Sequence, residues 1–486
     1  MEENITSTSS ENLDESVAKT ERMGTEKIGK LLWQFGVPAT VGILVNALYN
    51  IVDSIFIGRG VGELGIAAAT AAFPAMLLMM AFGMLIGGGG NALMAIKLGE
   101  KDFKTAEKIL GNSFSLMILV SVVVTALGLI FIKPILAFSG ASASVMPYAV
   151  DYMSIIFWGM LVQCVGFGMN NFIRTTGSPT RAMVTMLTGA CINIVLDYVF
   201  IMQLGWGVKG AAWATIIGQA VNSIIVIQYF TGKKSPLHLH FGAMKLVGHL
   251  VKSIIALGTA SCVMQVAASV VNVVLNSTLS RYGAHTSIGS SGALAAMGVV
   301  SKSAQFFVMP VMGIVMSAQP IIGYNYGAEK YDRVKKAFKL AAISSTIYLV
   351  IFWAFIEAFP ALIIGLFGLV KKDIVDFAGK ALRIYLLMMP LVGYQMVGST
   401  YFQSTGQPGK SAFLSLSRQV IFLIPAILVA PLIAQGLGAD PNATLLAIAI
   451  AAPVSDFLST LVTTILVVRE LRHLGEKHEA VLAAEI

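Results

Sequence analysis

Two acidic side chains in apolar surroundings carry the chemistry that this sequence offers. Asn193 and Asp197 stand one helical turn apart in the apolar stretch from Cys191 to Thr215, and Asp53 lies in the first apolar stretch of the chain. A carboxylate at the centre of a bilayer costs about 2.5 to 3.5 kcal/mol, so such residues usually face a cavity and mark an ion or proton path. We therefore expect Asp53 and Asp197 to form the coupling site of a transporter.

The elements that must position these acids are membrane-spanning helices. Hydrophobic residues make up 56% of the 486 positions and charged residues 12%, about half the charged share of soluble domains. One span takes about 20 apolar residues, and the pattern predicts an all-α polytopic membrane protein with twelve transmembrane helices. Their expected starts are near Leu31, Ile66, Leu110, Pro147, Ala182, Gly210, Leu250, Ser291, Phe338, Leu382, Ala412 and Ala443.

The distribution of basic residues indicates the orientation of the chain. Most of the 33 Lys and Arg fall on the side that holds both termini when the chain is threaded through these spans. Because basic loops stay in the cytoplasm, we expect a multi-pass membrane protein with both termini cytoplasmic. The net charge of +8 then reflects topology, and no nucleic-acid partner is expected. One cluster outside, from Lys371 to Arg383, departs from this rule and obscures the ninth and tenth boundaries.

Short loop motifs recur about half a chain apart. The stretch from Leu98 to Asp102 returns as Tyr326 to Lys330, and Thr176-Gly-Ser-Pro returns as Thr405-Gly-Gln-Pro, at shifts of 228 and 229 residues. We infer two copies of a six-helix unit, related by an axis along the membrane normal, with the site near mid-membrane. The expected domains are a disordered cytoplasmic tail at 1–27, an N-lobe at 28–230, a cytoplasmic linker at 231–249, a C-lobe at 250–470 and a cytoplasmic tail at 471–486.

Two longer motifs resemble the signatures of one transporter family. They are Asn46-Ala-Leu-Tyr-Asn-Ile-Val-Asp53-Ser-Ile-Phe-Ile-Gly58 and Gln319-Pro-Ile-Ile-Gly-Tyr-Asn-Tyr-Gly-Ala328. They are similar to the first-helix and eighth-helix signatures of the multidrug and toxic compound extrusion (MATE) family, and the second is most similar to its MepA-like bacterial branch. The resemblance implies two pseudo-symmetric six-helix bundles and a secondary active multidrug efflux transporter of the bacterial cell inner membrane. Such a transporter exports organic cations or amphipathic compounds by antiport with H+ or Na+, using alternating access.

The resemblance also implies a set of site residues in the N-lobe. Family members with an ion site there combine an acid on the first helix with polar residues on the fourth, fifth and sixth. The matching positions here are Asp53, Asn170 or Asn171, Asn193, Asp197 and Thr215. Other branches place acids on the seventh and tenth helices, where this chain offers only amides, so we expect no acidic cation site in the C-lobe. Those amides are Gln265, Asn272, Asn276 and Gln395.

The residue types in this set allow either of two coupling ions. Burial disfavours a charged carboxyl group and a second nearby acid adds to the effect, so Asp53 and Asp197 are able to hold a proton. Alternatively, two carboxylates with Asn193 and Thr215 supply the oxygen ligands that Na+ prefers. Residue types do not choose between these ions. A simpler interpretation makes the acids hydrogen-bonding partners between helices.

Other features suit a carrier with a broad substrate range. Pro38 removes one backbone hydrogen bond from the first helix, which predicts a kink that is either a hinge or a static bend. Flexible thioethers, aromatics and amides suit a cavity for varied apolar cations. The expected cavity residues are Tyr49, Met84, Phe172, Gln265, Asn272, Asn276 and Met396.

Two alternatives remain open. A flippase for a lipid-linked precursor would need a basic cavity for phosphates, and only Lys302, Arg174, Arg418 and Lys97 could serve. A non-transporting receptor or scaffold is the other alternative, although the repeat and the paired acids disfavour it. The run from Gly24 to Lys30 lacks the Ser or Thr of a nucleotide-binding loop, so we expect no enzyme activity and no cofactor. The expected partners are an ion gradient, small molecules and the lipid bilayer, with a functional monomer.

Overall fold

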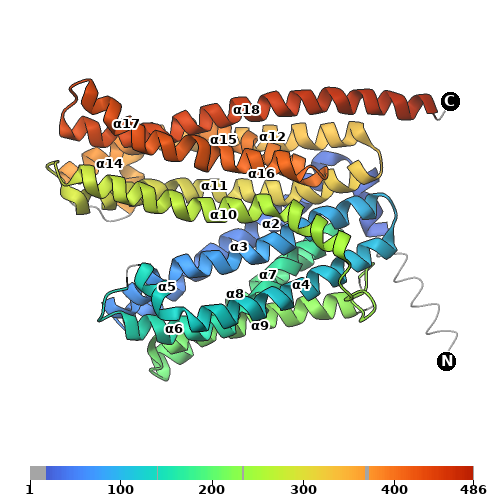
Figure 1. Ribbon diagram of the computed structural model, residues 1–486, viewed down its shortest axis with the longest axis horizontal. Coiled ribbons are helices and arrows are strands. Elements are labelled where there is room, and N and C mark those ends of the chain that lie inside the picture. The colour runs from blue at the N-terminus through green and yellow to red at the C-terminus, as the bar shows by residue number, and fades with distance from the viewer. Residues whose placement is uncertain (1–17, 140, 233–234, 367–370, 485–486) are drawn as a thin grey trace.

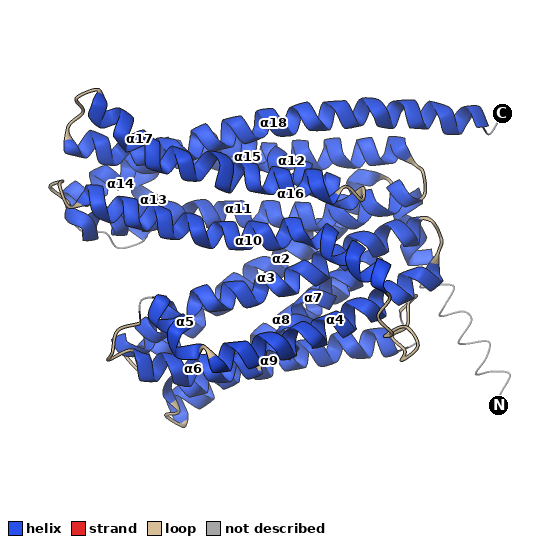
Figure 2. Ribbon diagram, viewed as in Figure 1, coloured by secondary structure: helices blue, strands red, loops and turns tan. Residues whose placement is uncertain are grey.

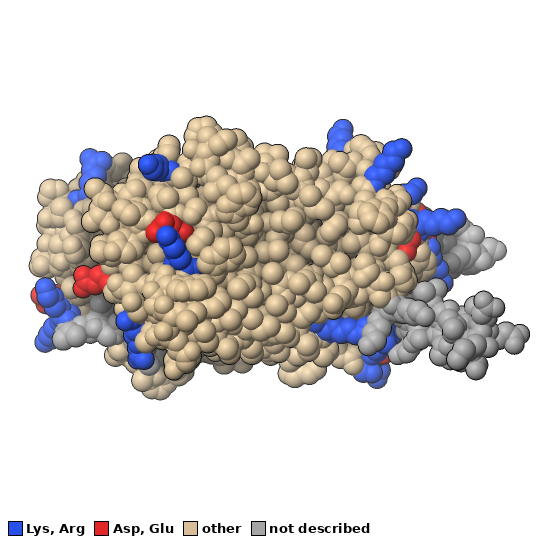
Figure 3. All heavy atoms as spheres, turned by 90° about the horizontal axis from the view of Figure 1, so that it is seen from below, with Lys and Arg blue, Asp and Glu red and all other residues tan. Residues whose placement is uncertain are grey.

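The computed structural model describes residues 18–139, 141–232, 235–366 and 371–484, and over these ranges it contains helices and loops but no strand (Figure 2). Long apolar segments fold this way because a backbone in lipid must satisfy its own hydrogen bonds. On the face drawn in Figure 3, charged side chains gather toward the two ends and leave a broad uncharged band between them. That band is what a bilayer core requires.

The N-lobe is built from the helices before residue 232. They are α2 (Ile28–Gly60), α3 (Glu63–Gly99), α4 (Phe103–Ile130), α5 (Ile132–Phe138), α6 (Met146–Trp158), α7 (Met160–Thr175), α8 (Pro179–Asp197), the π-helix η1 (Tyr198–Gln203) and α9 (Gly207–Thr231).

The C-lobe follows a linker that packs on the N-lobe, where Asn112 of α4 donates to the carbonyls of Ala243 and Lys245. Its helices are α10 (Gly248–Gly283), α11 (Gly289–Gly327), α12 (Tyr331–Ala358), α13 (Pro360–Leu366), α14 (Lys372–Tyr385), α15 (Met389–Ser404), α16 (Pro408–Leu416), the π-helix η2 (Ser417–Leu423), α17 (Ile424–Gly436) and α18 (Pro441–Ala484).

The described residues contain 10 helices long and apolar enough to cross a membrane, or up to 11 when the bent pair α6–α7 counts as one span. These correspond to eleven of the predicted segments. The remaining one, expected to start near Leu382, corresponds to α14 and α15, which are separated at Leu386–Met388. Helix α14 has 14 residues and α15 has 16, so each is too short to span alone, and charged residues between Lys372 and Arg383 also make α14 polar. Twelve spans therefore remain the prediction, and an all-α polytopic membrane fold is confirmed.

The lobes pack against each other at one end and diverge toward the other, as Figure 1 shows. Glycines permit the contact, because a Cβ on Gly99 would collide with the Tyr324 carbonyl and one on Gly327 with the Ile96 carbonyl. Both pairs of positions differ by the same 228 residues, so the contact is reciprocal, as a two-fold axis between repeats requires. Lys101 and Glu329, at equivalent positions, both adopt a positive φ, of 59° and 58°.

The N-terminal segment corrects one expectation. Residues 1–17 of the predicted disordered tail lie outside the described residues, but residues 18–25 form a helix in which Met23 is buried. The C-lobe holds this segment by its backbone, since Arg333 donates to the carbonyls of Met23 and Glu26, and Lys330 donates to that of Gly24. The N-lobe holds it at Thr20, whose hydroxyl donates to the Thr176 carbonyl. We call residues 18–26 the strap.

The C-terminal tail also differs from expectation. It was expected to begin at residue 471, but α18 continues without a break to Ala484. Leu474 is fully buried, so the first part of this extension still packs on the bundle.

Candidate functional site

The two acids predicted from the sequence lie together in the N-lobe. Asp53 lies in the C-terminal part of α2, and Asp197 is the last residue of α8, where the helix passes into the π-helix η1. Their carboxyl groups lie close enough to influence each other electrostatically. Asp53 is 9% exposed and Asp197 is 0% exposed, so neither acid is solvated as a surface carboxylate would be.

Most carboxyl oxygens of this acid pair have no hydrogen-bond donor among the described residues. Oδ1 of Asp53 and both carboxyl oxygens of Asp197 are buried and accept no hydrogen bond from the described residues. Buried polar atoms are nearly always paired, and leaving one unpaired costs about 1 to 3 kcal/mol. A proton or a cation between the two carboxyl groups would relieve this cost. The arrangement is therefore compatible with binding of a positive charge.

The seam between α8 and α9 brings two more predicted residues to the acids. Gly189 and Gly218 let these helices approach closely, because a Cβ on either would press against the carbonyl of the other. Near this seam, Asn193 donates from Nδ2 to the Thr215 hydroxyl at 3.5 Å, and Oδ1 of Asn193 is another buried acceptor without a donor. Asn193 lies one turn before Asp197, so its free acceptor adds to those of the acids.

Two tyrosines stand beside the acid pair. Tyr49 of α2 and Tyr152 of α6 both lie close enough to interact electrostatically with Asp53 and Asp197. Tyr152 is 3% exposed. The sequence placed Tyr49 in the substrate cavity and did not single out Tyr152. The spacing of Tyr49 four residues before Asp53 was a usable signal, but nothing local points to Tyr152.

The structure does not bring Asn170 and Asn171 to this pair. Both amide oxygens accept from Arg174, Oδ1 of Asn171 from Nη1 at 2.6 Å and Oδ1 of Asn170 from Nη2 at 3.0 Å. Asn170 also donates to the hydroxyl of Thr185. Thr185 lies twelve residues before Asp197 on α8, which is about 18 Å along a helix. These asparagines instead stabilise a buried arginine.

The chain is similar to known proteins over most of its length. A family model described as MatE matches residues 38–199 and 260–429, one segment in each lobe. The chain belongs to the MatE family. It is 27% identical over 402 residues to the multidrug export protein MepA of Staphylococcus haemolyticus, covering 83% of this chain and 87% of that protein. The predicted resemblance to the MATE family and its MepA-like branch is thereby confirmed.

Solved structures match the fold of this MatE chain over most of its length. One described as MATE in the bent conformation aligns with a TM-score of 0.86 and 22% identity, covering 96% of this chain and 99% of that one. Another, described as the outward-facing conformation of a multidrug resistance MATE family transporter, aligns with a TM-score of 0.85 and 22% identity, covering 94% and 98%. The two-bundle architecture expected from the sequence agrees with these neighbours.

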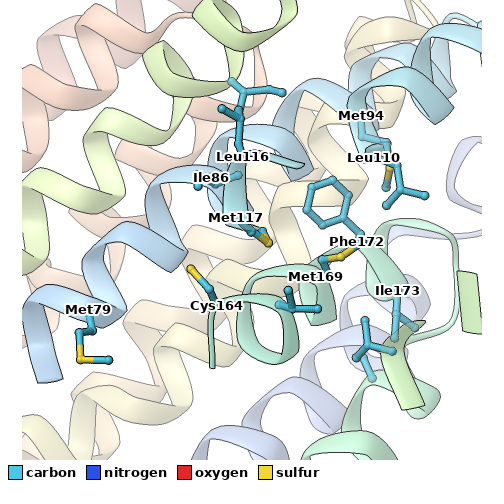
Figure 4. Packing of buried hydrophobic residues seen from close by; sticks show 14 of the residues in the cluster. Met79, Ile86, Met94, Leu110, Leu116, Met117, Cys164, Met169, Phe172 and Ile173 are labelled. Carbon is cyan, nitrogen blue, oxygen red and sulfur yellow. The ribbon is translucent and has the colours of Figure 1, made fainter. Parts of the chain in front are cut away.

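The cavity residues expected for this MatE chain fall into two groups. Phe172 is a correction, because it is 0% exposed and packs in the N-lobe core among Met94, Leu110 and Met169 (Figure 4). It fills the space that Gly90 leaves, since a Cβ there would lie 2.7 Å from its ring. The other expected residues are at least partly accessible. Tyr49, Met84, Gln265 and Met396 are half-buried, and Asn272 and Asn276 are exposed on α10.

Pro38 lies where the two lobes of this MatE chain touch. Helix α2 continues through it from Ile28 to Gly60. Two residues away on one side, Gly36 faces Ser317 of α11, and on the other side the Thr40 hydroxyl donates to the Pro310 carbonyl at 3.4 Å. The missing hydrogen bond of Pro38 is therefore placed at the interface between the lobes.

Sequence reasoning missed a chain of amide side chains that joins the lobes, in which Asn91 and Gln403 are buried and Gln319 is half-buried. Asn91 of α3 donates to Oε1 of Gln319 at 3.2 Å, and Gln319 donates in turn to Oε1 of Gln403 at 3.3 Å. Gln403 donates to the Leu257 carbonyl at 2.8 Å, and Thr175 donates to Asn91 from the other side. Asn91 and Gln319 differ by 228 positions, the period of the repeat, which was a signal that these two residues could meet at the axis.

Proposed function

We propose that this chain is a secondary active multidrug efflux transporter. It exports organic cations or amphipathic compounds from bacteria by antiport with H+ or Na+ across the inner membrane, with both termini in the cytoplasm. The observation that carries this proposal is the set of buried carboxyl oxygens on Asp53 and Asp197 that accept no hydrogen bond from the described residues. A site that needs a positive charge can exchange one cation for another.

The acid pair accounts for coupling as well as binding. When H+ or Na+ occupies the pair, its negative charge is neutralised, and an organic cation loses its electrostatic attraction to the site. When the ion leaves, the attraction returns. Competition of this kind links inward ion flow to outward movement of the drug. Na+ would be held by oxygen atoms of Asp53, Asn193, Asp197 and Thr215, and a proton by either carboxyl group.

Alternating access gives this competition a direction. The lobes pack at the end that holds the termini and diverge at the other (Figure 1), an arrangement that exposes the space between them to one side at a time. Pro38 is the proposed hinge, because a helix that lacks one internal hydrogen bond bends at lower cost. Its position beside Gly36 and Thr40, against α11, lets a bend in α2 alter the contact between the lobes.

Relatives and charge placement both support export of cations over a lipid-linked flippase. The similar staphylococcal proteins are described as multidrug export proteins. A flippase would need an excess of basic residues for phosphates, whereas Lys97 pairs with Glu100 at 2.6 Å, and the pair of Arg418 with Asp456 at 2.8 Å carries no net positive charge. Arg174 is 3% exposed and is bound by two asparagines.

The test is efflux in liposomes that contain the purified chain and a fluorescent organic cation. A pH gradient and a Na+ gradient are imposed separately, so that each ion is examined alone. Efflux under one gradient, abolished by collapsing that gradient, is the expected result and names the ion. Efflux under neither gradient, with protein that remains folded by size-exclusion chromatography, would overturn the proposal. Translocation of a labelled lipid in the same vesicles would then favour the flippase.

A further inference from the structure

The C-lobe contains a cavity that the N-lobe site does not explain. It measures about 230 Å³ and lies between four parts of the lobe, namely α11, the junction of α14 and α15, the π-helix η2, and α18. Polar and apolar side chains share its wall. The polar ones are Ser301, Gln305, Tyr385, Arg418 and Asp456, and the apolar ones include Val308, Met389, Val392 and Leu423.

An ion pair forms one wall of the cavity. Nε of Arg418 donates to Oδ1 of Asp456 at 2.8 Å, and Asp456 is only 7% exposed. Asp456 lies fifteen residues into α18, about 22 Å from the outer end of that helix, and so at the depth of the bilayer core. An apolar pair of similar volume would often be at least as stable as a buried ion pair. Charges kept at this depth usually serve a substrate or an ion.

The ion pair leaves binding capacity facing the cavity. Within the described residues, only Nε of Arg418 and only Oδ1 of Asp456 take part in a hydrogen bond between side chains. The terminal nitrogens of Arg418 and the second oxygen of Asp456 are not among the sealed polar atoms, so they face accessible space. A guanidinium edge offers two parallel donors to a carboxylate, and a carboxylate oxygen accepts from an ammonium group. Both are offered within one cavity.

The irregular backbone around the cavity is a second feature typical of a binding site. Arg418 lies in the π-helix η2, and the helical path is interrupted at Leu386–Met388, between Tyr385 and Met389. Single π-turns inside α-helices are frequently found at functional sites. At membrane depth, irregular backbone is tolerated where it is buried in protein or lines a polar cavity. Two such departures on one cavity are therefore consistent with a binding site.

The charge of the site selects the class of ligand. The ion pair is neutral, so a ligand with a net charge would leave one charge uncompensated in a medium of low dielectric constant, which is costly. A zwitterion adds no net charge, and its two ends match the two open groups. We propose that this cavity binds a small zwitterion with an apolar side chain, such as an aliphatic α-amino acid, with its carboxylate on Arg418 and its ammonium group on Asp456.

The volume and the lining of the cavity describe the proposed ligand further. Cavities for drug-sized ligands hold about 300 to 1,000 Å³, so a cavity of about 230 Å³ suits a smaller molecule. Val308, Val392 and Leu423 would contact its apolar part. Gln305 is the lining residue with an exposed side chain on α11. This site is separate from the acid pair of Asp53 and Asp197, and it stands even if the N-lobe couples to a different ion than proposed.

The test compares three probes on the full chain in lipid nanodiscs. Leucine carries both charged groups, 3-methylbutylamine carries only the ammonium group, and 4-methylpentanoate carries only the carboxylate. Radiolabelled leucine should bind saturably. The two single-charge analogues should compete about tenfold or more less well, because each lacks a charge-assisted contact and brings an uncompensated charge. Equal competition by the amine would refute recognition of a zwitterion.

Two double variants test whether leucine binds in this cavity. Arg418→Gln combined with Asp456→Asn removes both charges and should weaken leucine binding about tenfold or more. Lys209→Gln with Asp151→Asn removes an exposed ion pair of the N-lobe and should bind leucine as the wild type does. Unchanged leucine binding in the first double variant would overturn the assignment, as would absence of saturable binding in the wild type.

A further variant covers the case in which the first double variant does not fold. Val308→Phe fills the cavity and leaves both charges in place. It should also abolish leucine binding, and retained binding would contradict the site. Asp197→Asn should leave leucine binding unchanged, which separates this proposal from the efflux mechanism: loss of efflux with retained leucine binding is the expected pattern for that variant.

Discussion

In the N-lobe, three of the four carboxyl oxygens of Asp53 and Asp197 accept no hydrogen bond from the described residues. In the C-lobe, by contrast, Asp456 accepts a hydrogen bond from Arg418. Both sites lie in helices of one repeated architecture. The two sites differ in whether a neighbouring cation balances the negative charge of the acid. The proposed function uses the acid pair to bind a positive charge, while a neutral ion pair has no net demand for one. One fold thus holds a site that can respond to an ion gradient and a site that need not.

The largest expected effect removes the uncompensated charge. Asp197→Asn is nearly isosteric but cannot titrate or attract a cation, so gradient-driven efflux from liposomes should fall to the rate of passive leak. Asp151→Asn, an acid of the same lobe that pairs with Lys209 near the helix end, is the matched control and should transport normally. Wild-type coupled efflux by Asp197→Asn would remove this residue from the site.

The comparison also predicts that substitutions at the two sites change the free energy of unfolding differently. Arg418→Met alone strands the buried carboxylate of Asp456 and should cost about 3 to 5 kcal/mol of unfolding free energy, whereas Arg418→Met with Asp456→Leu should recover most of it. Asp197→Asn removes repulsion between acids and should not lower stability. Thermal unfolding in one detergent measures all three. Equal losses in the single and double C-lobe variants would show that Arg418 is not the compensating charge.

A smaller effect concerns the amides that join the lobes. Gln319→Leu leaves Asn91 and Gln403 without their shared partner, so we expect a loss of about 1 to 3 kcal/mol in unfolding free energy. Gln435→Leu, at an exposed position of α17, should have little effect. If both substitutions lower the unfolding temperature equally, the amide chain does not stabilise the interface.

The smallest expected effect concerns the N-termini of α4 and α12, which occupy equivalent positions in the two repeats. Asp102 caps α4 by accepting from the Thr105 amide at 3.0 Å, while the equivalent Lys330 makes no such cap on α12 and binds the strap instead. Asp102→Ala should cost about 1 kcal/mol. Hydrogen bonds from Thr105 lower the pKa of Asp102, so this stabilisation is present at neutral pH and is lost as pH falls through the lowered value. The difference in unfolding temperature between variant and wild type should therefore narrow in acid, and a difference independent of pH would contradict the cap.

Features that depend on residue type and period were predictable from the sequence. Acids in apolar segments need a reason, which identified Asp53 and Asp197, and helical spacing placed Asn193 one turn before Asp197. The repeat predicted equivalent loops, and the reciprocal glycine contacts agree with it. These inferences need only the chain and the cost of burying charge.

Features that depend on which helices meet were not predictable. Asn170 and Asn171 have the right type for an ion site, but Arg174, three and four residues later, takes their oxygens. That spacing was a local signal and was not used. The pairing of Arg418 with Asp456 spans 38 residues on different helices, and the sequence supports only the weaker statement that each charge needs a partner. The helix at residues 18–25 was read as disordered because its composition is polar, whereas its order comes from contacts with the other lobe.

The strap has a consequence for genetic studies of this protein. Arg333 and Lys330 hold it through carbonyl oxygens, which every amino acid carries, so side-chain substitutions leave these contacts in place. Thr20, Met23 and Gly24 are the strap positions where the side chain, or its absence, also matters. A scan of single substitutions across residues 18–26 would therefore report most of them as tolerated and could lead an investigator to discard the segment. A deletion would reveal its role, because only the loss of the backbone removes the acceptors.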